Sequence, residues 1–519
     1  LAPVEDTEGA VLVLAGAGSG KTRVLTFRIA YLIQNKQIAP FNILAITFTN
    51  KAAAEMKERV ASLVGQSDIL ISTFHSFCAR ILRWEIINLE GYNSNFSIYD
   101  DGDCGRIISR ILKDMEIEDA KDLKKDIRWH ISNAKNHALS PKDYAVKIKG
   151  EKNSVIVSAV FEQYEQQLRQ NNALDFDDLL LKTVTLFANN KEVLRKYQQR
   201  YQYIMVDEFQ DTNKIQYMLV RLLSAMYGNI FVVGDDDQSI YGWRWAEVEN
   251  IINFKKHFAG ARIYKLEQNY RSTANILNLA NKIIENNEQR MGKTLWTDGE
   301  NGVKVVYNSC YNERSEADYV VEQINSLIAR NEFKYKDFAV LVRANSITRA
   351  VEEKLTLYNF PYRVIGGSKF YERKEVKDFL AYLKLVVNPS DTESILRVIN
   401  TPKRGIGDGA VEKLVEACRS HGVTLMDGIL NLESLDLASG VAKKLATFSD
   451  IAQTLISAAS SMPLDQFVTF CRSIIKLESD FEKNSDEDKN RIENIDDFVH
   501  STEEFYKDNE GCSIEEYLQ

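Results

Sequence analysis

Short apolar runs alternate with amphipathic patterns along the first half of the chain. Between these runs, apolar residues recur three and four positions apart, which is typical of helices that bury one face. The runs themselves are short and rich in β-branched residues, which predicts buried strands. They cover residues 11–14, 43–48, 69–73, 203–206, 230–233 and 263–266. Strands that alternate with helices predict an α/β domain built on a parallel sheet.

The rest of the chain follows other patterns. Residues 76–200 show helical periodicity without a convincing buried strand, and we interpret them as a helical insertion. Apolar runs at 303–307, 338–342 and 362–365, with helical patterns between them, predict a second sheet domain. Helical periodicity then returns, and residues 476–510 are dense in Asp and Glu, which indicates a solvated tail.

Composition narrows the class of protein. The 519 residues are 45% apolar and 27% charged, as in an ordinary globular protein. The 65 Lys and Arg against 74 Asp and Glu give a net charge of −9, which argues against a protein that coats nucleic acid by bulk positive charge. A nucleic-acid site is therefore expected to be a local groove. No apolar run approaches the ~20 residues that span a bilayer. Six widely spaced cysteines without metal-binding spacing predict a cytoplasmic protein with reduced thiols.

The first candidate for chemistry is a glycine-rich segment that follows the strand at 11–14. Its sequence, Ala15-Gly-Ala-Gly-Ser-Gly-Lys-Thr22, precedes a helical pattern, which is the context of a phosphate-binding loop. We expect backbone N–H groups and the helix N-terminus to face phosphates, Lys21 to reach the β- and γ-phosphate oxygens, and Thr22 to hold Mg²⁺. Ala15 replaces the Gly of the strict pattern, and the alternative is a merely tight strand-to-helix turn.

Two acidic strand ends support a nucleotide site. The strand at 203–206 ends in Asp207 and Glu208, which suits Mg²⁺ binding by Asp207 and activation of a water by Glu208. The strand at 230–233 is followed by three aspartates and then Gln238, which we expect to sense a γ-phosphate. Acid pairs at strand ends are also common in plain solvated positions. They support a nucleotide site here because they occur in the same chain as the glycine-rich segment.

Seven ordered segments resemble the motifs of superfamily 1A DNA helicases of the PcrA, UvrD and Rep family, and within it the PcrA branch. They are residues 15–22, 45–57, 73–77, 174–179, 206–213, 232–245 and 266–272. The resemblance continues through residues 361–367, 371–378 and 400–407, and so covers essentially the whole chain.

The resemblance implies an α/β fold with two RecA-like P-loop domains, 1A and 2A, each carrying a mainly helical insertion, 1B and 2B. Domain 1A is expected at residues 1–75 and 201–266, and 1B at residues 76–200. Domain 2A is expected at residues 267–365 and 2B at residues 366–519. ATP is then expected between the two sheets, at the carboxyl ends of the strands.

The resemblance also extends the nucleotide site. It implies that Tyr270 stacks on the adenine and that Arg271 contacts the γ-phosphate, where its charge stabilises phosphoryl transfer. The expected catalytic residues are Lys21, Asp207, Glu208, Gln238 and Arg271. The expected ATP contacts are Ala15, Gly16, Ala17, Gly18, Ser19, Gly20, Lys21, Thr22, Arg23, Tyr270 and Arg271.

Single-stranded DNA is implied to cross the tops of both sheet domains, held by aromatic stacking and scattered cations. Each stacked base contributes ~1–3 kcal/mol without reading sequence, which accounts for binding by an acidic chain. For Phe48, which follows a buried strand, core packing is the alternative. Trp245 stands where the family usually has Gly, and it either adds a stacking surface or packs. The implied contacts are Phe48, His75, Phe176, Tyr241, Trp243, Arg244 and Asn345.

A further basic segment, Pro402-Lys-Arg-Gly-Ile-Gly407, precedes a helical pattern and resembles a helix-hairpin-helix element. The N–H groups of such a turn, together with Lys403 and Arg404, are expected to contact duplex DNA next to a junction with single-stranded DNA. A simple loop-to-helix turn is the alternative.

Some motifs of the family find no match. One unmatched motif has the pattern His-x-x-Lys-Gly-Leu-Glu-Phe. Thr348-Arg-Ala350 looks like a second motif, but it lies before the second insertion, whereas the family's motif follows it. We therefore expect the chain to lack the C-terminal part of 2A, and a companion C-terminal segment of the same protein to dock on 2A.

These residues predict an ATP- and Mg²⁺-dependent DNA helicase. It is expected to move 3′ to 5′ on single-stranded DNA and to unwind duplex in DNA repair or replication. One alternative is the helicase subunit of a recombination nuclease, which shares the motifs. The other is a nucleotide-gated clamp that binds single-stranded DNA without turnover, and Lys21, Asp207, Glu208 and Gln238 argue against it.

Overall fold

The chain divides into two compact units in the computed structural model. The first comprises Leu1–Gly302 and Asp378–Gln519, and the second comprises Val303–Lys377. The structure describes residues 1–117, 121–288, 290–343, 347–365, 370–481, 485–509 and 511–518.

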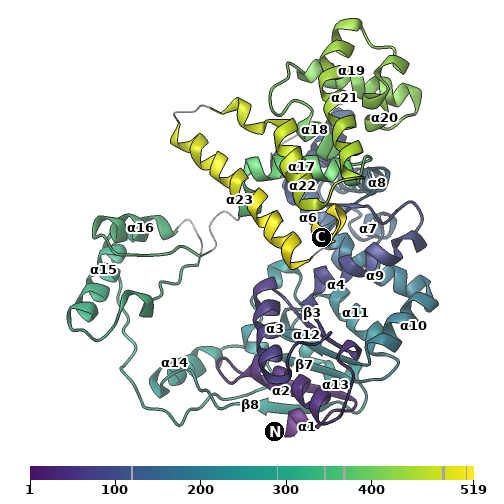
Figure 1. Ribbon diagram of the computed structural model, residues 1–519. Coiled ribbons are helices and arrows are strands. Elements are labelled where there is room, and N and C mark those ends of the chain that lie inside the picture. Colours follow the sequence, from purple (N-terminus) through teal and green to yellow (C-terminus); the bar gives the residue numbers. More distant parts are fainter. Residues whose placement is uncertain are drawn as a thin grey trace. The chain divides into compact units, whose positions relative to one another are not determined.

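A six-stranded parallel sheet forms the centre of the first unit (Figure 1). Its spatial order is β3-β2-β6-β7-β1-β8, and every neighbouring pair runs parallel. The strands are β1 (Ala10–Ala15), β2 (Ile43–Thr47), β3 (Leu70–Thr73), β6 (Tyr203–Val206), β7 (Ile230–Gly234) and β8 (Arg262–Leu266). The six strands expected from the apolar runs are therefore confirmed, as is the parallel α/β sheet.

Helices cover both faces of this sheet. The first layer holds α2 (Lys21–Gln34) and α3 (Asn50–Val64), and the second holds α4 (Phe74–Glu85), α9 (Phe176–Asn189) and α11 (Lys214–Ser224). In β1, Val11 and Val13 pack with the first layer, whereas Leu12 and Leu14 pack with the second. Because both faces are buried, the strand is apolar along its whole length instead of alternating.

The residues between β3 and β6 form a mostly helical region. Its other helices are α5 (Asp101–Asp114), α6 (Lys121–Asn136), α7 (Pro141–Lys147), α8 (Ser154–Gln170) and α10 (Lys191–Arg200). The expectation that this region has no buried strand is wrong. Here β4 (Ser97–Tyr99) and β5 (Ala173–Asp175) pair in parallel and are largely buried. Strands of three residues are too short to show a period of two.

Helices after residue 378 complete the first unit, and one of them is tied to α5 by buried charge. They are α18 (Thr392–Val398), α19 (Asp408–His421), α20 (Leu425–Leu430), α21 (Ser439–Ala459), α22 (Leu464–Ile475), α23 (Asp486–Asp508) and α24 (Ile514–Tyr517), and they follow α17 (Lys374–Val387). The buried carboxylate of Glu393 accepts from Arg106 at 3.3 Å and from Arg110 at 2.5 Å.

The acidic stretch at 476–510 is not a solvated tail where the structure describes it. There, α23 buries Ile495 and Phe498, and the ring of Phe498 lies 5.1 Å from that of Phe379 on α17. Glu493, Asp496, Asp497 and Glu504 of this helix are exposed, whereas Asp488 is buried. Charge density alone therefore concealed an amphipathic pattern.

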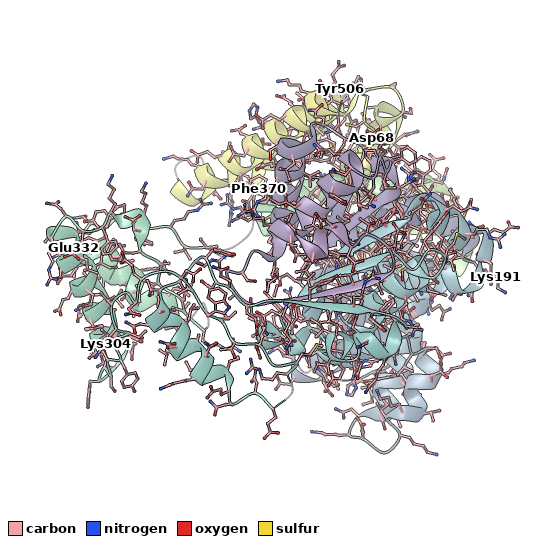
Figure 2. The ribbon with its side chains drawn as sticks, turned by 90° about the horizontal axis from the view of Figure 1, so that it is seen from below. Asp68, Lys191, Lys304, Glu332, Phe370 and Tyr506 are labelled. Atoms are coloured by element: carbon pink, nitrogen blue, oxygen red, sulfur yellow. The ribbon has the colours of Figure 1, made fainter. Side chains whose placement is uncertain are left out.

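The second unit holds α15 (Glu313–Ala329) and α16 (Thr348–Leu357), which bury Val321 and Leu355 between them. Figure 2 labels Lys304 and Glu332, two of its exposed residues. The second sheet expected here is absent from the described residues: the three apolar runs at 303–307, 338–342 and 362–365 form no strand. Leu341 is 94% and Ile365 88% exposed. Without neighbouring strands among the described residues, these runs cannot form a ladder, although Phe338 packs against the small cluster that holds Val321 and Leu355.

The other α-helices that the structure describes in the first unit are α1 (Ala2–Glu5), α12 (Glu249–Ile252), α13 (Phe254–His257) and α14 (Ala274–Ile284). Within the part of the chain that the structure describes, no helix combines the length and apolarity needed to cross a membrane.

Candidate nucleotide and DNA site

The glycine-rich segment connects β1 to α2. Gly18 (φ +68°) and Gly20 (φ +93°) adopt the left-handed backbone that favours glycine. Ser19 Oγ donates to the carbonyl oxygen of Gly16 at 2.7 Å and closes the turn. Among the described residues, no side chain caps the start of α2. Its first N–H groups and its positive end therefore suit an anion such as a phosphate.

Lys21 meets the acidic pair that follows β6. Its Nζ donates to Glu208 Oε2 at 2.6 Å, and Thr22 Oγ1 donates to Asp207 Oδ2 at 3.3 Å. Desolvation by burial raises the pKa of Asp207 to about 6, and the charge of Glu208 adds to the shift. A buried carboxylate beside a threonine hydroxyl fits Mg²⁺, because the cation takes oxygen ligands and relieves the local negative charge.

Gln210 links this acidic pair to the loop after β7. Its Nε2 donates to Glu208 Oε2 at 3.0 Å, and its Oε1 accepts from Asp235 N at 2.9 Å. Asp235 in turn accepts a short hydrogen bond from Gln238 Nε2. A continuous chain of hydrogen bonds thus runs from Lys21 to Gln238. Gln210 was missed at the sequence level, because a glutamine after an acidic pair has no signal of its own.

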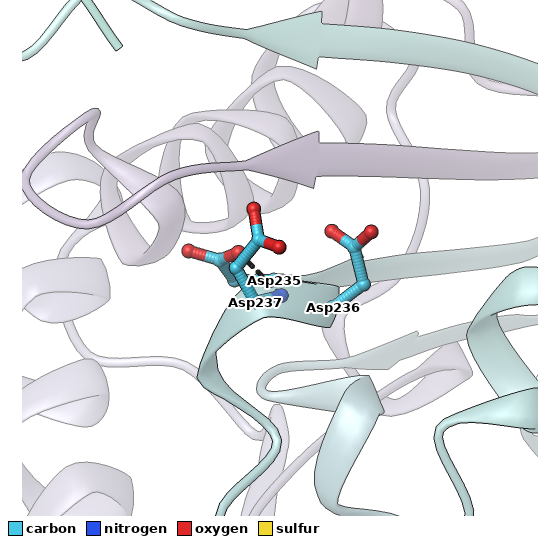
Figure 3. Close-up of side chains that lie close together, drawn as sticks. All are labelled: Asp235, Asp236 and Asp237. Atoms are coloured by element: carbon cyan, nitrogen blue, oxygen red, sulfur yellow. Dashed lines mark hydrogen bonds between the residues drawn. The ribbon is translucent and has the colours of Figure 1, made fainter. Parts of the chain in front are cut away.

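Three aspartates after β7 lie close together (Figure 3). Oxygens of Asp235, Asp236 and Asp237 lie within 4.8 Å of one another. The buried Lys293 Nζ contacts them at 2.6, 2.6 and 2.7 Å. Burial opposes the ammonium charge, but the carboxylates prevail and raise the pKa of Lys293. The ammonium therefore balances part of the negative charge of this cluster, and Arg290 contacts Asp237 at 2.9 Å. Three aspartates after a buried strand signal that a cation is needed, but they do not identify Lys293.

The segment after β8 lies against the glycine-rich loop. Tyr270 N donates to the carbonyl oxygen of Gly18 at 3.0 Å, and Asn269 Nδ2 donates to that of Ala17 at 2.6 Å. A Cβ on Gly18 would lie only 2.8 Å from the Cβ of Arg271. The side chain of Tyr270 is exposed. The structure thus brings both residues expected to contact the nucleotide to the edge of the phosphate-binding loop.

Five of the residues expected to contact DNA gather on the first unit. Phe176, the first residue of α9, meets His75 edge to face with ring centroids 6.0 Å apart. Desolvation lowers the pKa of His75 to about 4, and the charge of Arg244 adds to the shift, so the ring is neutral at pH 7. The guanidinium of Arg244 lies 4.6 Å from the ring centroid of Trp243, and that ring lies 6.1 Å from Tyr241.

Phe48 has a different environment from these five residues. Phe48 is partly buried, packs against the core cluster of the sheet and meets Phe74 edge to face at 5.6 Å. Its packing matches the core alternative. Asn345 lies outside the described residues.

The basic pair before α19 divides between surface and interior. Lys403 is exposed. Arg404 donates to the carbonyl oxygen of Val398 at 3.0 Å and to the hydroxyl of Tyr382 at 2.5 Å. Its guanidinium therefore holds the segment in place, and Lys403 is the member of the pair that faces solvent.

Comparison with known proteins decides the family. Residues 1–259 match the model of the UvrD/REP helicase N-terminal domain, and residues 264–519 match that of the UvrD-like helicase C-terminal domain. The chain belongs to the UvrD/REP helicase family. The resemblance drawn from its seven motif segments is thereby confirmed.

Relatives in this family extend the match. The chain is 43% identical over 523 residues to the ATP-dependent DNA helicase PcrA of Bacillus subtilis strain 168, covering 99% of this chain and 70% of the relative. It is 44% identical over 514 residues to the proteins of the same name from Staphylococcus aureus strain Mu50 and from Staphylococcus epidermidis, covering 98% of this chain and 69% of each relative. This UvrD/REP helicase chain is therefore PcrA-like.

Proposed function

We propose that this chain is an ATP-dependent DNA helicase that moves 3′ to 5′ along single-stranded DNA and unwinds duplex. The observation that carries the proposal is the chain of hydrogen bonds from Lys21 through Glu208, Gln210 and Asp235 to Gln238. It connects the phosphate-binding loop to the loop that bears Tyr241, Trp243 and Arg244, which form the aromatic cluster. The helicase names of the relatives support the same activity.

In the proposed reaction, each side chain has one role at the transferred phosphoryl group. Lys21 neutralises the β- and γ-phosphate oxygens, and Glu208 accepts a proton from the attacking water. Thr22 and Asp207 would hold Mg²⁺, which would supply Lewis-acid stabilisation of the developing charge. Arg271 adds positive charge at the γ-phosphate, and Tyr270 stacks on the adenine.

Coupling to DNA follows from the position of Gln238. The residue lies three positions before Tyr241, the first ring of the aromatic cluster, and its amide is bonded to Asp235. When ATP replaces the bond between Lys21 and Glu208 with phosphate contacts, Gln210 can pass the change to the Asp235 loop. Tyr241, Trp243 and Arg244 then alter their grip on the stacked bases.

Duplex DNA ahead of the motor is assigned to the segment before α19. Lys403 is exposed five residues before Asp408, the first residue of this helix, whose N-terminal N–H groups suit a phosphate. Arg404 positions the segment before α19.

The companion C-terminal segment of the same protein, which we expect to dock on 2A, stays a prediction.

The test is steady-state ATPase of the chain with and without oligo-dT, followed by strand separation on duplexes with a 3′ or a 5′ single-stranded tail. The proposal expects DNA-stimulated ATPase and separation of the 3′-tailed duplex. Nucleotide and DNA binding without turnover would indicate the nucleotide-gated clamp instead. Turnover without strand separation would restrict the activity to translocation.

A further inference from the structure

Trp245 is held against a second tryptophan from another part of the chain. Its ring centroid lies 5.2 Å from that of Trp129 on α6 and 5.9 Å from that of His137. Its Nε1 donates to Ser132 Oγ at 3.3 Å. The backbone of Trp245 is left-handed (φ +65°), a conformation that a bulky residue rarely adopts. These contacts offset that strain, so Trp245 serves as a fixed support for Trp129.

Trp129 itself is turned outward. Its side chain is 51% exposed, which excludes a role as a core residue. Lys125 and Lys121 precede it by one and two helical turns, and both are exposed. Residues four apart share one face of a helix. This face of α6 therefore presents a large aromatic ring preceded by two cations, with Asp126 and Asp122 three and seven residues before the ring.

Such a surface matches the chemistry of single-stranded nucleic acid. Bases stack on aromatic rings, and lysines contact the adjacent phosphates. An apolar peptide would gain nothing from the two ammonium groups. The surface also continues the aromatic cluster, because Trp245 follows Trp243 and Arg244 directly in sequence.

We propose that Trp129 is a further base-stacking residue, which extends the single-stranded DNA path from Trp243 onto α6 with Trp245 as its support. The inference rests on the proposed helicase function. It adds a contact that the motif segments of the family do not include.

The test uses the whole chain and a fluorescein-labelled oligo-dT, with dissociation constants measured by anisotropy. Loss of one stacked base predicts a roughly 5- to 150-fold weaker affinity for Trp129→Ala, and Trp129→Phe should recover most of it. Trp84→Ala is the matched control, because Trp84 is 72% exposed at the far end of α4; its affinity should equal that of the parent.

A double-mutant cycle tests the support by Trp245. Glycine accepts the left-handed backbone, so Trp245→Gly should fold and weaken binding by less than Trp129→Ala. The double variant should bind no more weakly than Trp129→Ala alone, because the two rings act as one unit. Additive losses would overturn the supporting role.

Failure of this inference is separable from failure of the proposed function. Trp243→Ala serves as the reference. If it weakens binding while Trp129→Ala binds like the parent, the inference is wrong and the DNA path stands. If neither variant changes affinity, the DNA path itself is wrong. Should Trp129→Ala misfold, Lys125→Ala gives the decision: the slope of log affinity against log salt should fall by about one, and an unchanged slope overturns the inference.

Discussion

Two clusters of buried charge in the first unit differ in how they are balanced. In the nucleotide cluster, Lys21 contacts Glu208, and their side chains are 11% and 37% exposed. In the second cluster, Lys135 on α6 has a side chain that is 0% exposed. Its Nζ contacts Asp175 at 2.9 Å, Asp178 at 2.8 Å and Glu165 at 2.7 Å. The first cluster is open to solvent, and the second is sealed.

The pKa values of the carboxyl groups follow this difference only in part, because burial and the charge of Asp175 raise the pKa of Asp178, a carboxyl of the sealed cluster, to about 7. Burial opposes ionisation of Asp175, yet Lys135 and Arg128 hold its pKa well below the ordinary value. Burial and Glu208 instead raise the pKa of Asp207 to about 6. Lys135 and Arg128 thus stabilise the charge of Asp175 in the sealed cluster, whereas Asp207 in the open cluster carries negative charge that a ligand cation would relieve. We infer that the open cluster takes part in chemistry. The sealed cluster positions Phe176, because Asp175 caps α9 directly before that residue.

The largest expected effect breaks the open cluster. Lys21→Ala should lower ATP turnover by about 10³- to 10⁵-fold, the range that one cation at a transferred phosphoryl group supplies. Affinity for single-stranded DNA should remain largely intact, since Lys21 reaches the aromatic cluster only through Glu208, Gln210 and Asp235. Steady-state ATPase and anisotropy measure the two effects. Lys36→Ala, at an exposed lysine after α2, is the control, and near-parental turnover of Lys21→Ala would remove the phosphate-loop assignment.

The next effect separates nucleotide binding from chemistry. Glu208→Gln keeps the hydrogen bond acceptor for Lys21 but cannot take a proton from water, so turnover should fall by about 10²- to 10⁴-fold with ATP affinity retained. Titration with a fluorescent ATP analogue checks the affinity. Asp211→Asn, which changes a carboxyl that accepts from Gln210 at 3.3 Å, is the matched control and should lose much less. Normal turnover of Glu208→Gln would require another base.

The sealed cluster predicts a loss of stability instead. Lys135→Met leaves three carboxylates in a dry site without their ammonium, and the free energy of unfolding should fall by about 3–5 kcal/mol. Urea denaturation followed by circular dichroism measures it. Lys182→Met is the control, because Lys182 contacts Glu165 at 3.1 Å from a partly exposed position and should cost less. Equal losses of stability for both variants would mean that the burial of the lysine does not determine how much its ion pairs contribute.

The sequence predicted the open cluster much better than the sealed one. The glycine-rich loop and the strand ends before Asp207 and Gln238 follow from local patterns, because parallel strands place their carboxyl ends at one edge of a sheet. Lys135 and Lys293 did not stand out, since a lysine in a helix or loop looks the same whether buried or solvated. Their roles depend on carboxylates that come from distant segments.

The second sheet shows the same limit for secondary structure. The apolar run at 338–342 resembles that at 230–233, yet only the latter forms a strand, β7, which lies between β6 and β1. A run of β-branched residues shows which side chains a strand would bury at that position. Whether the strand forms depends on the neighbouring strands with which it would pair. The sequence also did not predict the outward position of Trp129 against Trp245. Helical periodicity does not show which exposed ring packs against a residue from another segment.

The smallest expected effect concerns pH and a group outside both clusters. Desolvation lowers the pKa of His75 to about 4 in the folded chain, against about 6.5 when unfolded. Between these values the unfolded chain binds the extra proton, so stability from this group is complete above pH 6.5 and falls as the pH is lowered toward 4. Urea denaturation from pH 7 to pH 5 should show this slope, and His75→Gln should reduce it. Because carboxylates titrate in the same range, the difference between parent and variant is the quantity to compare. A variant with the parental slope would mean that His75 is solvated, and hence that the face bearing Phe176 and Arg244 is more open than its packing indicates.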